Sequence, residues 1–382
     1  MNEENLNNGG VRRKVHITLV GGQLAPGYNA IKATTPDIVE VVYSEQTKND
    51  IEVLRDVINI HIEDSKPLSA TNLHEILDRA KDLAEKYADD DVTLNITSGT
   101  KSWSHLFAAT MLNARVIYFD QNNVLWDFSE LTSRKCDFDI DFATHFKLYK
   151  NPLKDSAKLD DYDENDAEVA ENIEKIWRNY AYRREFSDLT NNLNQTEENE
   201  KRKIKPDGSY VKWDKNTDDE NYWVEINIAN AEAGDFPRRF ESRHAKSLVL
   251  NAGWFEYKVA KLFSRWGKCK GIILNGVFKY DDSGNDKNEV DVIVKTDNKL
   301  IFVECKTTIR QNKELDKFAN VVRKYGGTGS KGLFITAKRK HSDTIEKCKE
   351  NGFILPNCYY WPNFNERKFF ESLEQELDKL NP

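Results

Sequence analysis

The sequence predicts an α/β protein of two domains, the first built on a doubly wound, mostly parallel sheet. Three observations support this fold class. The chain has 382 residues, more than one hydrophobic core usually serves. Between residues 14 and 130, short apolar runs alternate with amphipathic stretches, a pattern typical of parallel sheets covered by helices. A second pattern of helices and strands begins near residue 248, after a stretch of different composition.

Strands and helices alternate throughout the first region. Apolar residues recur at helical spacing in the amphipathic stretches and run continuously in the short segments between them. A glycine pair follows the first apolar run and marks the turn that ends this strand. The expected strands cover residues 15–20, 38–43, 58–62, 92–96, 116–119 and 124–128, and the expected helices cover residues 50–57, 72–87 and 98–112.

The composition changes between the two regions. Residues 160–166 form an acidic run, residues 167–192 have helical spacing, and residues 197–205 are almost wholly charged. Residues 222–228 favour a strand. No motif here carries chemistry, so we interpret residues 148–245 as a partly helical connector, either a linker or a small adaptor.

The C-terminal region forms the second predicted domain. Its apolar runs are short, rich in Val, Ile and Phe, and separated by helical patterns. The expected domains are therefore residues 1–147 and residues 246–382, joined by the connector. In the second domain, helices are expected at residues 254–263, 313–325 and 342–350, and strands at residues 271–280, 289–295, 299–307 and 331–336.

Composition excludes several classes of protein. No stretch approaches the roughly 18–20 apolar residues of a membrane span, and the polar, Asn-rich start lacks the apolar segment of a secretion signal. The 5 cysteines are scattered without a CxxC pair, which indicates neither a disulfide framework nor a zinc knuckle. We therefore expect a cytoplasmic protein with no membrane partner. The formal net charge of −8 argues against a broadly basic surface but allows a local one.

Two β-rich runs flank Asp297 and Asn298, residue types that suit a tight hairpin turn. If these two residues form the turn, Asp291 and Glu304 are equally far from it and face each other across the ladder. Facing residues have Cβ atoms about 4.5–5.5 Å apart. Two carboxylates at that distance repel each other unless a proton or a cation lies between them. Mg²⁺ and Mn²⁺ prefer oxygen ligands, so the pair predicts a divalent metal site.

Lys306 lies two residues beyond Glu304 and therefore on the same face of the strand. An ammonium there can polarise an attacking water or stabilise developing negative charge. Cys305 points to the opposite face, where its side chain belongs to the core and its carbonyl oxygen is a further candidate metal ligand. Glu-x-Lys also occurs at residues 256–258 and 366–368. Such triplets usually lie on the solvated surface. Only the triplet at residues 304–306 ends an apolar strand opposite an Asp.

A helix, a strand with Asp, a strand with Glu-x-Lys and a second helix together resemble the PD-(D/E)xK nuclease fold, over roughly residues 250–355. The resemblance implies a restriction-endonuclease-like α/β domain that cuts phosphodiester bonds. Val290 replaces the Pro of the motif. The family also often places a Glu on its first helix near the metals, and Glu256 matches that position. The alternative is that Glu256 is an ordinary exposed helix residue.

The run NITSGTK, residues 95–101, lies between an expected strand and an expected helix. Backbone N–H groups at such a helix start bind anions, and a glycine allows a phosphate to approach closely. Loops that follow neighbouring parallel strands converge on one site at the carboxyl edge of the sheet. The alternative is a simple turn and helix cap. The candidate ligand-binding residues in these loops are Gly21, Gly22, Gln23, Ser44, Thr97, Ser98, Gly99, Thr100 and Lys101.

This run resembles the NITGGTK signature of CRISPR-associated Rossmann-fold (CARF) domains, with Ser98 in place of the first glycine. The resemblance covers about residues 14–145. It implies a Rossmann-like domain that dimerises and binds cyclic oligoadenylates across its two-fold axis. The run is neither a Walker loop nor a GxGxxG motif, so ATP and NAD are not expected.

The two resemblances together indicate a cyclic-oligoadenylate-activated nuclease of type III CRISPR systems. They imply a homodimer that is activated by cyclic tetra-adenylate (cA4) and uses Mn²⁺ or Mg²⁺. The expected substrate is DNA, and RNA is a second candidate. Three alternatives remain open: a constitutive restriction-like nuclease, a signal-binding regulator without catalysis, and an N-terminal domain that cleaves its own activator. Candidates for substrate-backbone contacts, which could equally be a solvated helix face, are Lys313, Lys317, Arg323 and Lys324.

Overall fold

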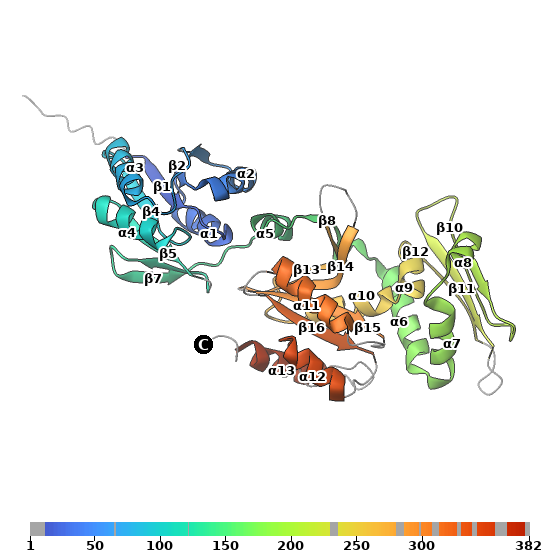
Figure 1. Ribbon diagram of the computed structural model, residues 1–382. Helices are drawn as coiled ribbons and strands as arrows, with labels where there is room; N and C mark the ends of the chain where they lie inside the picture. Colours follow the sequence, from blue (N-terminus) through green and yellow to red (C-terminus); the bar gives the residue numbers. More distant parts are fainter. Residues whose placement is uncertain are drawn as a thin grey trace, which may run out of the picture. The chain divides into compact units, whose positions relative to one another are not determined.

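The computed structural model describes residues 12–64, 66–120, 122–229, 236–279, 286–297, 299–307, 313–326, 330–337, 342–355 and 365–378. The chain divides into two compact units, the first ending at Pro152 and the second beginning at Leu153 (Figure 1). The second unit thus contains most of the stretch that the sequence suggested as a connector.

The first unit contains a seven-stranded sheet in the order β3-β2-β1-β4-β5-β6-β7. Its strands from β3 to β5 are parallel, and β6 and β7 are antiparallel additions at one edge. The predicted mostly parallel sheet is confirmed. The strands are β1 (Lys14–Leu19), β2 (Ile38–Val42), β3 (His61–Asp64), β4 (Asp91–Asn95), β5 (Arg115–Phe119), β6 (Val124–Asp127) and β7 (Thr132–Lys135).

Helices cover this sheet, and apolar clusters fill the space beneath them. The third strand begins later than the expected residue 58, because Ile58 is buried as the C-terminal cap of the preceding helix. The helix that follows β1 was not predicted. The helices are α1 (Ala25–Thr34), η1 (Glu45–Thr47), α2 (Lys48–Val57), α3 (Leu73–Lys86), α4 (Lys101–Thr110) and α5 (Phe142–Leu148).

The second unit is centred on a five-stranded sheet in the order β16-β15-β14-β13-β8. All its neighbouring strands are antiparallel except β15 and β16. The strand at one edge comes from the start of the connector, so the connector is built into this sheet. The strands are β8 (Leu153–Ala157), β13 (Gly271–Lys279), β14 (Asp286–Lys295), β15 (Leu300–Lys306) and β16 (Lys331–Thr336).

Helices α10 (Gly253–Ser264) and α11 (Lys313–Gly326) cover opposite faces of this sheet. Val303 and Cys305 of β15 lie in the apolar cluster that contains most of α10. On β16, Phe334 packs edge-on against Phe318 of α11, with ring centroids 5.9 Å apart. Because alternate strand residues point to opposite faces, both faces of the central strands are buried.

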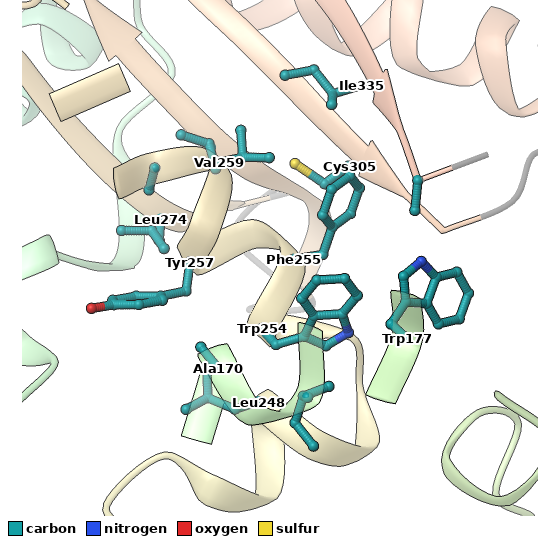
Figure 2. Close-up of a cluster of buried hydrophobic side chains, with 14 of the residues drawn as sticks. Ala170, Trp177, Leu248, Trp254, Phe255, Tyr257, Val259, Leu274, Cys305 and Ile335 are labelled. Carbon is teal, nitrogen blue, oxygen red and sulfur yellow. The ribbon is translucent and has the colours of Figure 1, made fainter. Parts of the chain in front are cut away.

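The connector also contributes a four-stranded antiparallel sheet in the order β12-β11-β10-β9. Its apolar face joins the same core as α10. Figure 2 shows Trp177 of the connector beside Trp254 and Phe255, and the two tryptophan rings lie 6.0 Å apart. The elements are η2 (Leu159–Asp161), α6 (Glu164–Arg178), α7 (Tyr180–Thr190), α8 (Gln195–Glu200), β9 (Arg202–Ile204), β10 (Tyr210–Lys215), β11 (Tyr222–Ile228) and β12 (Phe236–Ser242).

The single helix expected over residues 167–192 is instead two helices. Asn179 separates them because its side chain accepts a hydrogen bond from the Ala181 N–H and so begins α7. No described helix is long and apolar enough to cross a membrane. The remaining helices are α9 (Ala245–Leu250), α12 (Ser342–Glu350) and α13 (Glu366–Asp378).

Candidate active site and ligand loops

The hairpin register predicted for β14 and β15 is confirmed. Val292 pairs with Val303 and Lys295 pairs with Leu300 in an antiparallel ladder. Asp291 and Glu304 occupy the next facing positions, where the ladder ends. Asn298, the second residue of the predicted turn, lies outside the described residues.

At the end of this ladder, the Asp291 carboxylate takes the place of a backbone carbonyl as the acceptor for the Cys305 N–H. Its Oδ2 accepts a hydrogen bond of 2.7 Å from the Cys305 N–H. The Lys306 ammonium lies 2.7 Å from Glu304 Oε1 and 3.8 Å from Asp291 Oδ2. The structure therefore brings the three predicted catalytic residues together at one end of the sheet.

Burial and mutual repulsion shape the acidity of this cluster. Burial, followed by the nearby charge of Glu304, raises the pKa of Asp291 to about 7. Burial opposes the charged form of Lys306, but the carboxylates of Asp291 and Glu304 outweigh it and raise the pKa of this lysine. Lys306 is therefore a cation at neutral pH, and it stabilises the charged form of its acidic neighbours.

Glu256 projects from the first turn of α10 into the same cluster. Burial and the negative charge of Asp291 raise the pKa of Glu256 well above its usual value. An exposed surface glutamate would not show this shift. The structure therefore places Glu256 near Asp291, Glu304 and Lys306 and not at an isolated, exposed helix position.

Glu289 is a site residue that the sequence analysis missed. It precedes Asp291 by two positions on β14 and so lies on the same face of the strand. Its charge contributes to the raised pKa values of both Glu256 and Asp291. The alternation Glu-x-Asp before the turn was the available signal, because it mirrors Glu-x-Lys on the facing strand.

The cluster has an excess of negative charge. It contains four carboxylates (Glu256, Glu289, Asp291 and Glu304) and one ammonium, from Lys306, and two of the carboxylates have raised pKa values. An oxygen-rich donor set of this kind fits a hard divalent cation. Within the described ranges, no three His, Cys, Asp or Glu side chains already converge in metal-binding geometry. The Cys305 side chain is buried in the core, as predicted.

The predicted basic residues of α11 divide into two pairs. Arg323 donates hydrogen bonds to the Asn320 side chain and the Ala319 carbonyl, and the Lys324 ammonium lies 5.2 Å from the centre of the Tyr325 ring. Both are thus engaged within their own helix. The remaining two, Lys313 and Lys317, are exposed.

The predicted ligand loops of the first unit meet at the carboxyl edge of three adjacent strands. β1 lies between β2 and β4, so the loops that follow them are neighbours. A Cβ atom on Gly21 would lie only 1.6 Å from the Ser98 carbonyl oxygen. The Ser98 hydroxyl donates a 3.0 Å hydrogen bond to the Gln23 carbonyl. The first and third loops therefore touch, and this contact depends on the absence of a side chain at Gly21.

Several hydroxyls in these loops already hold the loops in shape. The Thr97 hydroxyl bonds the Asn95 side chain and accepts the Phe119 N–H at 2.8 Å. Thr100 accepts the Trp103 N–H and caps α4, and Ser44 begins the short helix η1. The other four predicted residues lie partly or wholly exposed at the same edge: Gly22, Gln23, Gly99 and Lys101.

Comparison with protein families identifies the domains that contain these two sites. Residues 15–143 match the Card1 CARF domain, and residues 243–357 match the Card1-like endonuclease domain. The chain joins a CARF domain to a Card1-like endonuclease domain. The ligand loops fall within the CARF match and the Asp291 cluster within the endonuclease match, so the chain is a CARF nuclease.

Solved structures share the fold of this chain at low sequence identity. Can2 from Sulfobacillus thermosulfidooxidans, in complex with cyclic tetra-adenylate, is 18% identical with a TM-score of 0.65, covering 94% of this chain and 99% of its own. Protein VC1899 from Vibrio cholerae is 14% identical with a TM-score of 0.70, covering 95% and 98%. A type III CRISPR defence DNA nuclease activated by cyclic oligoadenylate is 18% identical with a TM-score of 0.54, covering 86% and 46%. A search of curated protein sequences found no match.

Proposed function

We propose that this CARF nuclease is switched on by a cyclic oligoadenylate, cyclic tetra-adenylate, and then cleaves DNA and RNA in type III CRISPR antiviral defence. The observation that carries the proposal is that one chain contains both a candidate activator-binding site and a candidate nuclease site. The first is a set of loops, rich in glycines and hydroxyls, at the carboxyl edge of a parallel sheet. The second is the cluster of Asp291, Glu304 and Lys306. The nucleic-acid substrate makes the cytoplasm the expected place of action.

The nine loop residues around Gly21, Ser98 and Lys101 form the proposed activator site. Backbone N–H groups at the start of α4 and the exposed Lys101 supply positive potential for a phosphate. Gly21 and Gly99 keep the loops free of side chains where a ligand must approach. We propose that two chains pair through their CARF domains and enclose one ring across the two-fold axis.

Asp291 and Glu304 are the proposed ligands of Mn²⁺ or Mg²⁺, with the Cys305 carbonyl oxygen and Glu256 as further ligands. A cation held by these residues would lower the pKa of a bound water and neutralise charge on the scissile phosphate. Lys306 positions the attacking water or stabilises the charge that develops on the phosphate oxygens. The 2.7 Å contact between Lys306 and Glu304 fixes the ammonium beside the proposed ligands.

The test is cleavage of a labelled plasmid and a labelled single strand with Mn²⁺, with and without cyclic tetra-adenylate, by the wild type and Glu304→Ala. Cleavage that requires the activator and is lost in the variant supports both halves of the proposal. Cleavage independent of the activator would retain the nuclease and reject the switch. Activator binding without any cleavage would identify a signal-binding regulator instead.

A further inference from the structure

A cavity beside the catalytic cluster is lined on one side by catalytic residues and on the other by residues that the catalytic proposal does not use. It has a volume of about 510 Å³, within the roughly 300–1,000 Å³ of small-ligand sites. Glu256, Lys306 and Thr307 line it on the catalytic side. The opposing lining comes from the end of α7 and the segment before α10: Ser187, Asn191, Asn192, Leu250, Asn251 and Ala252.

The second wall is polar but uncharged. It presents one hydroxyl, from Ser187, and three carboxamides, from Asn191, Asn192 and Asn251. Within the described part of the chain, none of these four side chains has a hydrogen-bond partner. Carboxamides offer both donors and acceptors, as base edges and sugar hydroxyls do. Contacts to a phosphate backbone alone would favour lysine and arginine.

The wall is held in place by the core of the second unit. Leu189 and Leu250, on the segments that carry the wall, are buried in the cluster that also contains Trp177 and Trp254. Figure 2 shows Trp177, Leu248 and Trp254 of this cluster at the start of α10. Asn192 has a φ of 57°, in the left-handed region that asparagine tolerates. The polar groups are thus presented from a packed surface, which lowers the entropy cost of binding.

We propose that this amide-lined pocket binds the base and sugar of one unpaired nucleotide next to the scissile phosphate. The inference rests on the proposed function, since it places the scissile phosphate at Lys306. The cavity that Lys306 lines is also lined by Ser187, Asn191 and Asn251, so these groups are available to the nucleoside that adjoins this phosphate. A base inside a duplex is stacked and its edge is already paired, so it must leave the helix to enter the pocket. The pocket therefore contributes base preference at the nucleotide next to the cut.

The test uses variants that remove one amide each without disturbing the backbone. Asn191→Ala suits an extended residue, φ −103°, and Asn192→Gly keeps the left-handed conformation available. Asn165→Ala, at an exposed position of α6, is the matched control. Cleavage of four labelled single-stranded homopolymers is measured with Mn²⁺ and activator. Each pocket variant should lose about threefold to tenfold in kcat/KM and change its preference among the four bases, whereas the control should match the wild type.

Unchanged kcat/KM and unchanged base preference in both pocket variants would overturn the inference. Equal unfolding temperatures and equal activator affinities separate a pocket effect from misfolding. If the wild type cleaves nothing, the proposed function fails, and the pocket is then judged by binding of the same labelled strands. Weaker strand binding by Asn191→Ala than by Asn165→Ala supports the pocket even then. Equal binding by the two variants rejects it.

Discussion

The two sites of this chain both lie where strands end, but they are built from opposite chemistry. The loops of the CARF domain contain no carboxylate among their predicted ligand residues, and the glycines and hydroxyls around Gly21 and Ser98 hold one another in shape. The nuclease site gathers four carboxylates and the Lys306 ammonium, and burial raises the pKa of two of the carboxylates. The first site therefore depends on close packing of backbone, and the second depends on charge.

This difference matches the proposed ligands. A cyclic oligoadenylate carries its own phosphates, so a site of backbone N–H groups can bind it without a buried charge. A metal ion needs anionic ligands, and holding them together in its absence is unfavourable. Substitutions that change the shape of the loops should therefore weaken activator binding at the CARF site. Substitutions that remove a charge should reduce cleavage at the nuclease site.

The largest effect is expected when a charge is removed from the nuclease site. Glu304→Gln keeps the size of the side chain but removes a proposed metal ligand and the ionic partner of Lys306. Activator-dependent cleavage should fall by about 10²-fold or more, and binding of the activator should not change. Glu366→Gln, in another Glu-x-Lys triplet, is the control and should cleave normally. Comparable loss in both variants would contradict the assignment of Glu304.

A smaller effect is expected from a change of shape in the CARF domain. Gly21→Ala places a methyl group 1.6 Å from the Ser98 carbonyl oxygen, so the two loops must separate. Activator affinity should fall at least about tenfold, equivalent to about 1.4 kcal/mol. At Gly22 an added Cβ has no atom within 4 Å, and Gly22→Ala should bind nearly as well as the wild type. Affinities are measured by titration calorimetry, and equal values for the two variants would reject the role of the Gly21–Ser98 contact.

The two units should also respond to pH in opposite directions. Burial lowers the pKa of His16 on β1 to about 3, so the folded unit keeps this histidine neutral while the unfolded chain protonates it below about pH 6.5. The stability that His16 contributes is present above pH 6.5 and falls by about 2 kcal/mol between pH 7 and pH 5. Asp291 has a raised pKa, so the stability it contributes is present at about pH 4 and is lost as pH rises through 7.

Hydrogen exchange of the intact chain in EDTA, corrected for intrinsic exchange rates, measures both responses. Between pH 7 and pH 5, strand β1 should lose protection and β14 should gain it. His16→Leu should weaken the first trend and Asp291→Asn the second. Changes of the same sign in the exchange protection of β1 and β14 would contradict the charge difference between the units.

The smallest expected effect concerns the start of α4. The Thr100 hydroxyl accepts the Trp103 N–H at 3.2 Å, and Thr100→Ala removes this cap at a cost of about 1 kcal/mol in local stability. Thr100→Ser retains the cap and should restore protection of the first turn. An unchanged exchange rate in Thr100→Ala would indicate that another group satisfies this N–H.

Much of the nuclease site was predictable because hairpin geometry is local. The strand alternation and the turn at Asp297 place Asp291 opposite Glu304, and the structure has the same register. The same alternation pointed to Glu289, although the expected strand began at that residue and its role went unrecognised. The third strand of the CARF domain was misplaced, since the apolar pattern does not distinguish a buried helix cap at Ile58 from a strand residue.

The wall of the amide-lined pocket was not predictable from the sequence. Ser187 and Asn191 have no periodic pattern around them that signals a site, and they are distant in the chain from Lys306. Only the shared core of α6, α7 and α10 brings them together. Glu256 was reached by family resemblance, whereas its interaction with Asp291 became evident only in the folded structure.

The most direct test of the account is an activator titration of the cleavage rate. With Mn²⁺ present and the protein well above the dissociation constant, cyclic tetra-adenylate is added in steps and the initial rate on a labelled single strand is recorded. If the two sites are coupled, we expect almost no cleavage without the ring and a rate that rises and saturates at one ring per two chains. A rate that does not respond to the ring would contradict the coupling of the two sites.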